Sequence, residues 1–333
     1  MRAIVVNSWL KGPNDLQVSD IPVPTTKDGE LLVKVDSAGA NFFDVLMIAG
    51  KYQIKPPFPF TLGAEFAGTI VRASPNDSRF AVGDRVFGSN VIGAYAEYIA
   101  VPSVQCFPIP PAFSFEQAAG IYIMYPTSYA GLVLKAKVQA GDWVLVHAAA
   151  GGVGIAAVQI AKALGARVIA ATGSSAKFDV CRQQGADHCI NYHDADWADQ
   201  VLRLTDGKGA DVVYDPVGKV EESLKCVAWN GRIVVVGFAA GSIEKVATNR
   251  VLLKNVAVTG VYWGAYALNE PERIPEVWDA VFKLAEDGLI RPVIFQPIFY
   301  GLDQVKDALK AIAQRETYGK AIVKPSERPV SKL

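Results

Sequence analysis

Cysteine and histidine are scarce in this sequence, and their spacing does not fit the usual metal sites. The four cysteines are Cys106, Cys181, Cys189 and Cys226. No two of them form a C-x-x-C pair, and none has a histidine at the spacing of a tetrahedral zinc site. We interpret all four as free thiols of a reducing compartment. His188 and His193 flank a predicted strand and are interpreted as solvated.

The sequence also lacks an excess of charge of one sign. Lys plus Arg and Asp plus Glu each number 33, so the formal net charge is zero. A balanced surface provides no positive field for nucleic acid or an anionic membrane, and this favours a small-molecule partner. No apolar run reaches the roughly 18 residues of a membrane-spanning helix, and the first residues do not resemble a secretory signal. We therefore expect a soluble, unsecreted protein.

The length and the pattern of apolar residues predict two domains. The chain has 333 residues, of which 51% are apolar, and single cores stop growing at roughly 250 to 300 residues. Residues 1–122 hold short β-rich runs between Pro and Gly clusters, as in a largely antiparallel domain. Over residues 123–266, apolar strands alternate with helices, which is typical of a doubly wound α/β parallel sheet. Amphipathic helices and a last strand in residues 267–333 predict a return to the first domain.

The stretch HAAAGGVGIAAVQIAKALG follows a predicted strand and indicates a dinucleotide-binding βαβ unit. Ala149 stands where such turns usually carry their first glycine, which is acceptable if its φ stays negative. Gly151 then lets the backbone approach the pyrophosphate, and Gly154 lets the helix lie close to the sheet. The N–H groups of Gly152 and Val153 are expected to face the anion.

The end of the next strand favours NADPH over NADH as the coenzyme. An NAD site carries Asp or Glu there to bind the ribose 2′-hydroxyl. This sequence has Gly173 and Ser174 at that place, with Lys177 one turn into the next helix. Ser174 can donate to a 2′-phosphate, and Lys177 can pair with it. Tyr192, at the end of the following strand, is expected beside the adenosine.

Together with further segments, these residues resemble the zinc-free quinone oxidoreductases of the medium-chain dehydrogenase/reductase superfamily. The segments are SAGANFFDVLMIAGKY, FPFTLGAEFAG, VGDRVFG, GAYAEY, AAAGGVG, GADVVYDPVG, GRIVVVGF and YGKAIV. The resemblance implies a GroES-like catalytic domain, residues 1–122 and 267–333, and a Rossmann domain, residues 123–266, with the coenzyme in the cleft. It also implies a homodimer.

The same resemblance implies a site without metal. Zinc alcohol dehydrogenases hold their catalytic ion with cysteine and histidine, and the corresponding places here are Asn41 and Ala64. Without a Lewis acid, conjugated carbonyls and quinones are the expected substrates, because their charge delocalises onto oxygen. Asp44 and Glu65 also match family residues, and for them we favour a structural role. Leu46 stands where many relatives have a polar residue or a tyrosine, which leaves the substrate open.

Roles of individual residues follow from the resemblance. Asn41 and Tyr52 match residues that line the substrate and nicotinamide cleft, and Tyr52 is the candidate donor to a developing enolate. The residues that match positions near the nicotinamide are Thr127, Phe238, Tyr262 and Trp263.

Three functional classes stay open. We expect an NADPH-dependent reductase that transfers hydride to quinones or α,β-unsaturated carbonyls, with the proton coming from Tyr52 or water. The first alternative is a 2-enoyl thioester (enoyl-CoA) reductase, which needs a long pocket with basic residues at its mouth. The second is a non-catalytic NADPH-binding or RNA-binding protein, against which the neutral charge counts.

The last three residues, Ser331, Lys332 and Leu333, spell a peroxisomal address. The import receptor reads this tripeptide at a free carboxyl end. Pro325 and Pro329 are expected to keep the tail extended and clear of the last strand. We therefore expect a peroxisomal protein that binds this receptor, with the cytoplasm as the alternative. Work beside β-oxidation enzymes favours the enoyl-CoA alternative without establishing it.

Overall fold

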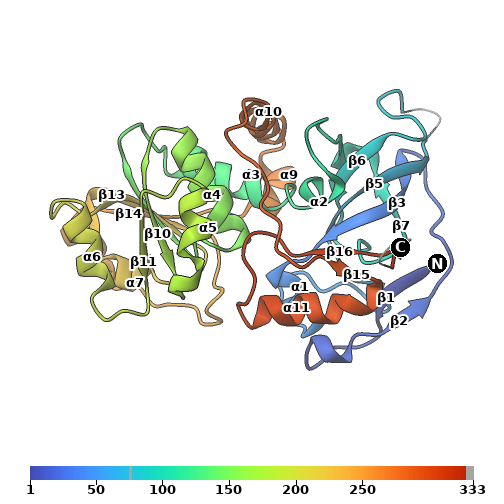
Figure 1. Ribbon diagram of the computed structural model, residues 1–333, viewed down its shortest axis with the longest axis horizontal. Helices are drawn as coiled ribbons and strands as arrows, with labels where there is room; N and C mark the ends of the chain where they lie inside the picture. The colour runs from blue at the N-terminus through green and yellow to red at the C-terminus, as the bar shows by residue number, and fades with distance from the viewer. Residues whose placement is uncertain (75–76, 328–333) are drawn as a thin grey trace, which may run out of the picture. The chain divides into compact units, whose positions relative to one another are not determined.

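The computed structural model describes residues 1–74 and 77–327, which form two compact units (Figure 1). The first unit holds residues 1–123 and the described residues from 292 onward, and the second holds residues 124–291. The first boundary lies one residue from the predicted one. The return to the first domain, predicted at residue 267, is corrected to residue 292.

The second unit contains a parallel sheet of six strands in the order β11-β10-β9-β12-β13-β14. In its central strands nearly every side chain is buried, because helices cover both faces, and this explains their continuous apolar sequence. The strands are β9 (Trp143–His147), β10 (Arg167–Thr172), β11 (His188–Asn191), β12 (Ala210–Asp215), β13 (Val227–Val235) and β14 (Ala257–Gly260).

Helices connect these strands, so each strand enters the sheet in the same direction. Helix α4 packs on β9 and β10, and α5 packs on β10 and β11. The helices of this unit are α3 (Met124–Tyr129), α4 (Gly152–Ala163), α5 (Phe178–Gln183), α6 (Trp197–Leu204), α7 (Val220–Ser223), α8 (Thr248–Lys254), α9 (Tyr266–Asn269) and α10 (Arg273–Glu286). The short helical segments are η3 (Ala130–Lys135), η4 (Ser175–Lys177) and η5 (Trp263–Ala265).

Helix α10 is the reason for the corrected boundary. It buries Val277, Trp278 and Val281 and packs against α3 and α9, both of which belong to the second unit. The amphipathic pattern of the sequence predicts this helix, but a pattern of apolar residues does not say which core the helix joins.

The first unit is largely antiparallel and contains two sheets. A sheet of three strands has the order β2-β1-β4, and a larger one has the order β15-β16-β3-β5-β6-β8, with β7 paired to β3. The strands are β1 (Arg2–Val6), β2 (Val18–Asp20), β3 (Glu30–Gly39), β4 (Phe60–Thr61), β5 (Glu65–Arg72), β6 (Arg85–Ser89), β7 (Tyr98–Pro102), β8 (Cys106–Pro108), β15 (Phe299–Tyr300) and β16 (Ile322–Lys324).

The helices of the first unit are short. They are α1 (Phe42–Ile48), α2 (Phe115–Ala118), α11 (Val305–Ala313), η1 (Pro13–Asp15), η2 (Ser103–Gln105) and η6 (Leu302–Gln304). Helix α11 packs against α1, and its buried face joins the core of this unit. Across both units, no helix in the described ranges is long and apolar enough to span a membrane.

Strand β16 brings the end of the chain to the end of β3. Ile322 pairs with Gly39 and Val323 with Ala38 in antiparallel register. A Cβ atom on Gly39 would lie 2.5 Å from the carbonyl oxygen of Ala119 and 2.7 Å from Cε of Lys320. Only glycine fits so close to another backbone. The approach places the Lys320 side chain next to the segment that follows β3.

Candidate functional site

The predicted coenzyme residues of the second unit, apart from Thr127, lie at or beyond the carboxyl ends of the parallel strands. In open α/β sheets, ligands bind outside this edge. The turn 148–151 follows β9, the segment 173–177 follows β10, and Tyr192 directly follows β11. Phe238 lies beyond β13, and Tyr262 and Trp263 lie beyond β14. Thr127 is half-buried in α3.

The glycine-rich turn brings helix α4 unusually close to the end of β9. A Cβ atom on Gly154 would lie 2.2 Å from the carbonyl oxygen of Ala148 and 2.8 Å from Cα of Ala149. Both obstacles are backbone atoms, which cannot rotate away. Glycine at position 154 is therefore a steric requirement of this crossing.

The strain of the turn lies at Ala148 and not at Ala149. Ala148 has a φ of 45°, whereas Ala149 is absent from the described residues with positive φ. A left-handed conformation costs a residue with a Cβ atom about 1–2 kcal/mol. Ala149 is fully buried, and its N–H donates to the carbonyl oxygen of Ala171 at 3.0 Å. Three successive alanines contain no signal that tells which of them is strained.

The start of α4 fits an anionic group such as a pyrophosphate. Gly151 is the N-cap residue, and no side chain caps the helix. The N–H groups of the first helical turn have no partner within the helix. They carry the positive end of the helix dipole, so an anion can bind there. Gly152 and Val153, the predicted donors, are the first two helical residues.

The end of β10 carries no acidic side chain. Gly173 and Ser174 follow the strand, and Ser174 caps the short helix η4 by accepting from Ala176 N–H at 3.3 Å. Ser174 is exposed and Lys177 is half-buried. A hydroxyl and an ammonium group thus stand where an NAD site has a carboxylate.

A buried polar network supports this edge of the sheet and was not predicted. The carboxylate of Asp215 accepts hydrogen bonds from the N–H groups of Val217, Gly218 and Lys219 at 2.8, 3.0 and 2.6 Å. These bonds fix the loop after β12. His147 ends β9, and its Nε2 lies 2.9 Å from Oγ of Ser223. Burial lowers the pKa of His147 to about 4, so the imidazole is neutral near pH 7.

The first unit contains a buried cluster around Asn41. Nδ2 of Asn41 donates to Oε1 of Glu65 at 2.9 Å and to the carbonyl oxygen of Gly39 at 3.3 Å. The ammonium group of Lys320 donates to Oδ1 of Asn41 at 2.7 Å and forms an ion pair with Glu65. Both amide atoms of Asn41 are therefore engaged by the protein. Lys320 is part of the segment YGKAIV, whose pattern indicates no role for this lysine.

A second buried carboxylate orients the backbone of Asn41. Oδ2 of Asp44 accepts the N–H of Asn41 at 2.9 Å and the hydroxyl of Tyr95 at 2.7 Å. Burial raises the pKa of Asp44 to about 7, and these two hydrogen bonds oppose the rise only in part. With Glu65 fully buried, both carboxylates hold protein segments in place, and these contacts match the structural role favoured for them.

Tyr52 and the aromatic residues of the second unit are more accessible. Tyr52 is half-buried, and its ring stacks on Phe43 with centroids 5.2 Å apart. Phe238 and Tyr262 are exposed. Trp263 is half-buried, with its ring 5.0 Å from that of Tyr266.

Among the described residues no group of three or more His, Cys, Asp or Glu side chains could hold a metal ion.

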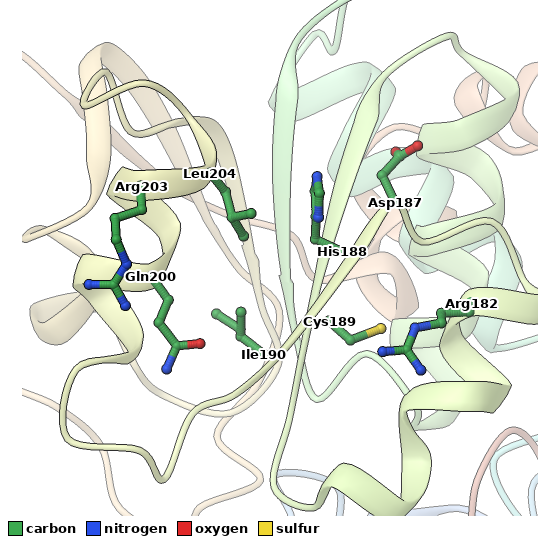
Figure 2. Close-up of a pocket in the computed structure, with 8 residues that line it drawn as sticks. All are labelled: Arg182, Asp187, His188, Cys189, Ile190, Gln200, Arg203 and Leu204. Atoms are coloured by element: carbon green, nitrogen blue, oxygen red, sulfur yellow. The ribbon is translucent and has the colours of Figure 1, made fainter.

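The second unit has two hollows. The first, of about 370 Å³, lies beside β11 and includes His188, its first residue, with Arg182 and Arg203 on the flanking helices (Figure 2). The second, of about 310 Å³, includes Trp143 and Arg167, the first residues of β9 and β10. Neither includes a predicted coenzyme residue, because those lie at the carboxyl ends.

An antiparallel unit with short helices and a parallel unit with a glycine turn at its carboxyl edge define the class of protein. This is the architecture of a medium-chain dehydrogenase/reductase. Residues 27–111 match the alcohol dehydrogenase GroES-like domain, and residues 152–283 match the family described as zinc-binding dehydrogenase.

Individual relatives narrow the family. The quinone oxidoreductase-like protein 2 homolog of Nematostella vectensis is 39% identical over 88% of this chain and 81% of that protein. The crystal structure of Escherichia coli quinone oxidoreductase complexed with NADPH is 30% identical, covers 98% of this chain and 100% of that one, and has a TM-score of 0.89. The crystal structure of CurK enoyl reductase is 26% identical over 97% and 99% of the two chains, with a TM-score of 0.84. The chain belongs to the quinone oxidoreductase-like family of medium-chain dehydrogenases/reductases and is an oxidoreductase.

The close approach of α4 to the end of β9 at Gly154 predicts the effect on stability of adding one methyl group at this position. Gly154→Ala forces the backbone of residues 148 and 149 away and is expected to lower the free energy of unfolding by about 1–3 kcal/mol. It should also weaken dinucleotide binding, because the turn moves. Urea unfolding and coenzyme titration measure the two effects. The control is Gly12→Ala, since a Cβ atom there meets nothing within 4 Å. Equal behaviour of the two variants would contradict the steric argument.

The raised pKa of Asp44 predicts a pH-dependent stability. Between its ordinary value of 3.8 and about 7, the folded protein holds a proton that the unfolded chain releases. The contribution of Asp44 to the free energy of unfolding is therefore greatest below about pH 4 and is lost as the pH rises through about 7. Asp44→Asn removes this ionisation while keeping an oxygen acceptor.

The measurement is urea unfolding at about pH 5 and about pH 8. The stability of the wild-type protein relative to Asp44→Asn should fall by about 1–3 kcal/mol between them. Asp20→Asn, at an exposed position on β2, is the control. An unchanged difference between wild type and Asp44→Asn would show that Asp44 does not titrate in this range.

Proposed function

We propose that this oxidoreductase uses NADPH to reduce quinones or α,β-unsaturated carbonyl compounds. The main support for NADPH over NADH is one observation. Gly173, Ser174 and Lys177 follow β10, where an NAD site has a carboxylate. A 2′-phosphate meets a hydroxyl and an ammonium group there instead of a repelling charge. The Escherichia coli relative that was crystallised with NADPH supports this choice.

When bound, NADPH supplies the hydride. The second unit holds the coenzyme. The N–H groups of Gly152 and Val153 bind the pyrophosphate at the uncapped start of α4, where Gly151 permits its approach. Ser174 and Lys177 bind the 2′-phosphate. Tyr192 packs beside the adenosine. The residues proposed for the nicotinamide end are Thr127, Phe238, Tyr262 and Trp263.

In the first unit, Asn41 and Tyr52 have different proposed roles. The amide of Asn41 is held by Glu65 and Lys320, so Asn41 shapes the substrate environment as a positioning residue. Tyr52 donates a hydrogen bond or a proton to the oxygen that becomes negative as hydride adds to the substrate. Conjugated substrates spread this charge, so the reaction is proposed to need no metal.

One observation supports the enoyl thioester alternative. The chain shares its fold with CurK enoyl reductase over nearly its whole length. Hydride addition to the β-carbon of a thioester is the same step as addition to an enone. The substrate class must therefore be decided by assay.

The homodimer stays a prediction, and the outermost strand of the second unit, β14, supports it. Strand β14 ends the sheet and leaves its outer side unpaired among the described strands. Apolar side chains on and beside it are exposed, namely Val258, Leu252 and Leu253. An exposed strand edge with apolar neighbours is a surface that a second copy can cover.

Coenzyme choice is tested by direct titration. NADPH is expected to bind at least about tenfold more tightly than NADH, or about 1.4 kcal/mol. Lys177→Ala should weaken NADPH and leave NADH unchanged, because only NADPH carries the 2′-phosphate. The control is Lys208→Ala. Lys208 is exposed and lies beside the hollow at the amino ends of β9 and β10. Equal losses for both coenzymes would show that Lys177 does not bind the 2′-phosphate.

The reaction is tested with three oxidants side by side: 9,10-phenanthrenequinone, a simple enone and crotonyl-CoA. Turnover of the first two with NADPH supports the proposal, and a preference for crotonyl-CoA supports the alternative. Tyr52→Phe should lower the rate with the enone more than with the quinone, since an enolate depends more on a positioned donor. Tyr98→Phe, another half-buried tyrosine of the first unit, is the control. Identical losses on both substrates would assign Tyr52 to packing.

The peroxisomal address rests on Ser331, Lys332 and Leu333, which lie outside the described residues. We propose that the import receptor binds this tripeptide. A fluorescent protein fused before Met1 should form puncta that coincide with a peroxisomal marker. Deleting Leu333 should disperse the signal into the cytosol. A diffuse signal from the intact fusion, in cells with working peroxisomal import, would overturn the proposal.

A further inference from the structure

Two rings lie against the end of β10, directly over Gly173. A Cβ atom on Gly173 would lie 2.8 Å from the hydroxyl oxygen of Tyr192 and 3.2 Å from Nε2 of His193. A side chain at position 173 would therefore have to displace the ends of a phenol and an imidazole.

The backbone places His193 at this position. Strands β10 and β11 pair in parallel up to Thr172 and Asn191, and the N–H of Tyr192 donates to the carbonyl oxygen of Thr172 at 3.0 Å. The N–H of His193 donates to Oδ1 of Asn191 at 3.0 Å. The loop thus turns back over the end of β10 directly after Tyr192, which is 8% exposed.

The imidazole of His193 has unused hydrogen-bonding capacity. Its ring lies 4.9 Å from the Tyr192 ring at an angle of 70°. The side chain is exposed, as the sequence predicts, and within the described ranges its ring nitrogens form no hydrogen bond or ion pair. An imidazole N–H can donate to a phosphate oxygen.

Charged groups of both signs lie on the segments next to this loop. Lys219 lies over the Tyr192 ring, with Nζ 5.4 Å from its centroid. His147, 6.2 Å from the same ring, stays neutral because burial lowers its pKa. The other charged residues of the neighbouring segments are Lys177, Asp179, Asp194, Asp196 and Glu222.

We propose that His193 is a ligand of the 2′-phosphate of NADPH. The inference rests on the proposed use of NADPH and adds a residue to the same site. The imidazole ring lies at the end of β10, where Ser174 follows Gly173, and provides a further hydrogen-bond donor for a phosphate monoester. NADH has no 2′-phosphate, so its binding does not depend on this donor.

The experiment is calorimetric titration of NADPH and NADH into wild type and variants. His193→Ala removes the ring donor and should lose at least about fivefold in NADPH affinity. NADH affinity should not change. His193→Arg provides a hydrogen-bond donor to the phosphate in place of the imidazole and should keep the NADPH affinity. His188→Ala is the control, since it changes an exposed histidine at the first residue of β11.

Each outcome has one interpretation. Unchanged NADPH affinity in His193→Ala overturns the inference. An equal loss for NADPH and NADH assigns His193 to the shape of the loop and also overturns it. If wild type does not prefer NADPH and Lys177→Ala changes nothing, the proposed coenzyme itself is wrong. That result is distinguishable from a failure of His193 alone.

Discussion

The approach of α4 to the end of β9 is the constraint on which the second unit depends. The missing side chain of Gly154 lets the helix start directly behind the turn, within contact of the Ala148 carbonyl group. The helix then begins without a side-chain cap, at the edge of the sheet where the other strands also end. A larger residue would move the helix start and with it the N–H groups proposed as donors for the pyrophosphate. Strain at Ala148 is the cost of this arrangement.

In the first unit, the main constraint is that a polar side chain, Asn41, is held in a buried position. Asn41 lies among Glu65, Lys320 and Asp44, and the first two of these form an ion pair away from water. A buried ion pair contributes little net stability, because both charges lose their hydration. Its effect here is positional: it fixes the amide of Asn41 from two sides. The first unit therefore needs the last strand for its polar cluster as well as for its sheet.

The strand ends of the second unit show how a local pattern and a distant contact together shape one site. The absence of an acidic residue after β10 can be seen in the sequence. The side chains that a Cβ atom at Gly173 would meet cannot be seen there, because Tyr192 and His193 belong to the end of the next strand and its loop. His193 was interpreted as solvated, and it is exposed. Its position over Gly173 comes from the parallel pairing of β10 and β11.

By itself, the sequence determined the two-domain organisation, the parallel sheet and the family, because apolar periodicity and glycine spacing are local properties of the chain. It also predicted that the residues proposed for the coenzyme in the second unit lie together, since parallel strands bring their carboxyl ends to one edge. Only the tertiary structure decided that α10 packs in the second unit, that Ala148 carries the strain, and that Lys320 meets Asn41 across 279 residues. These features depend on which surfaces pack together, and that is set by contacts between segments far apart in the chain.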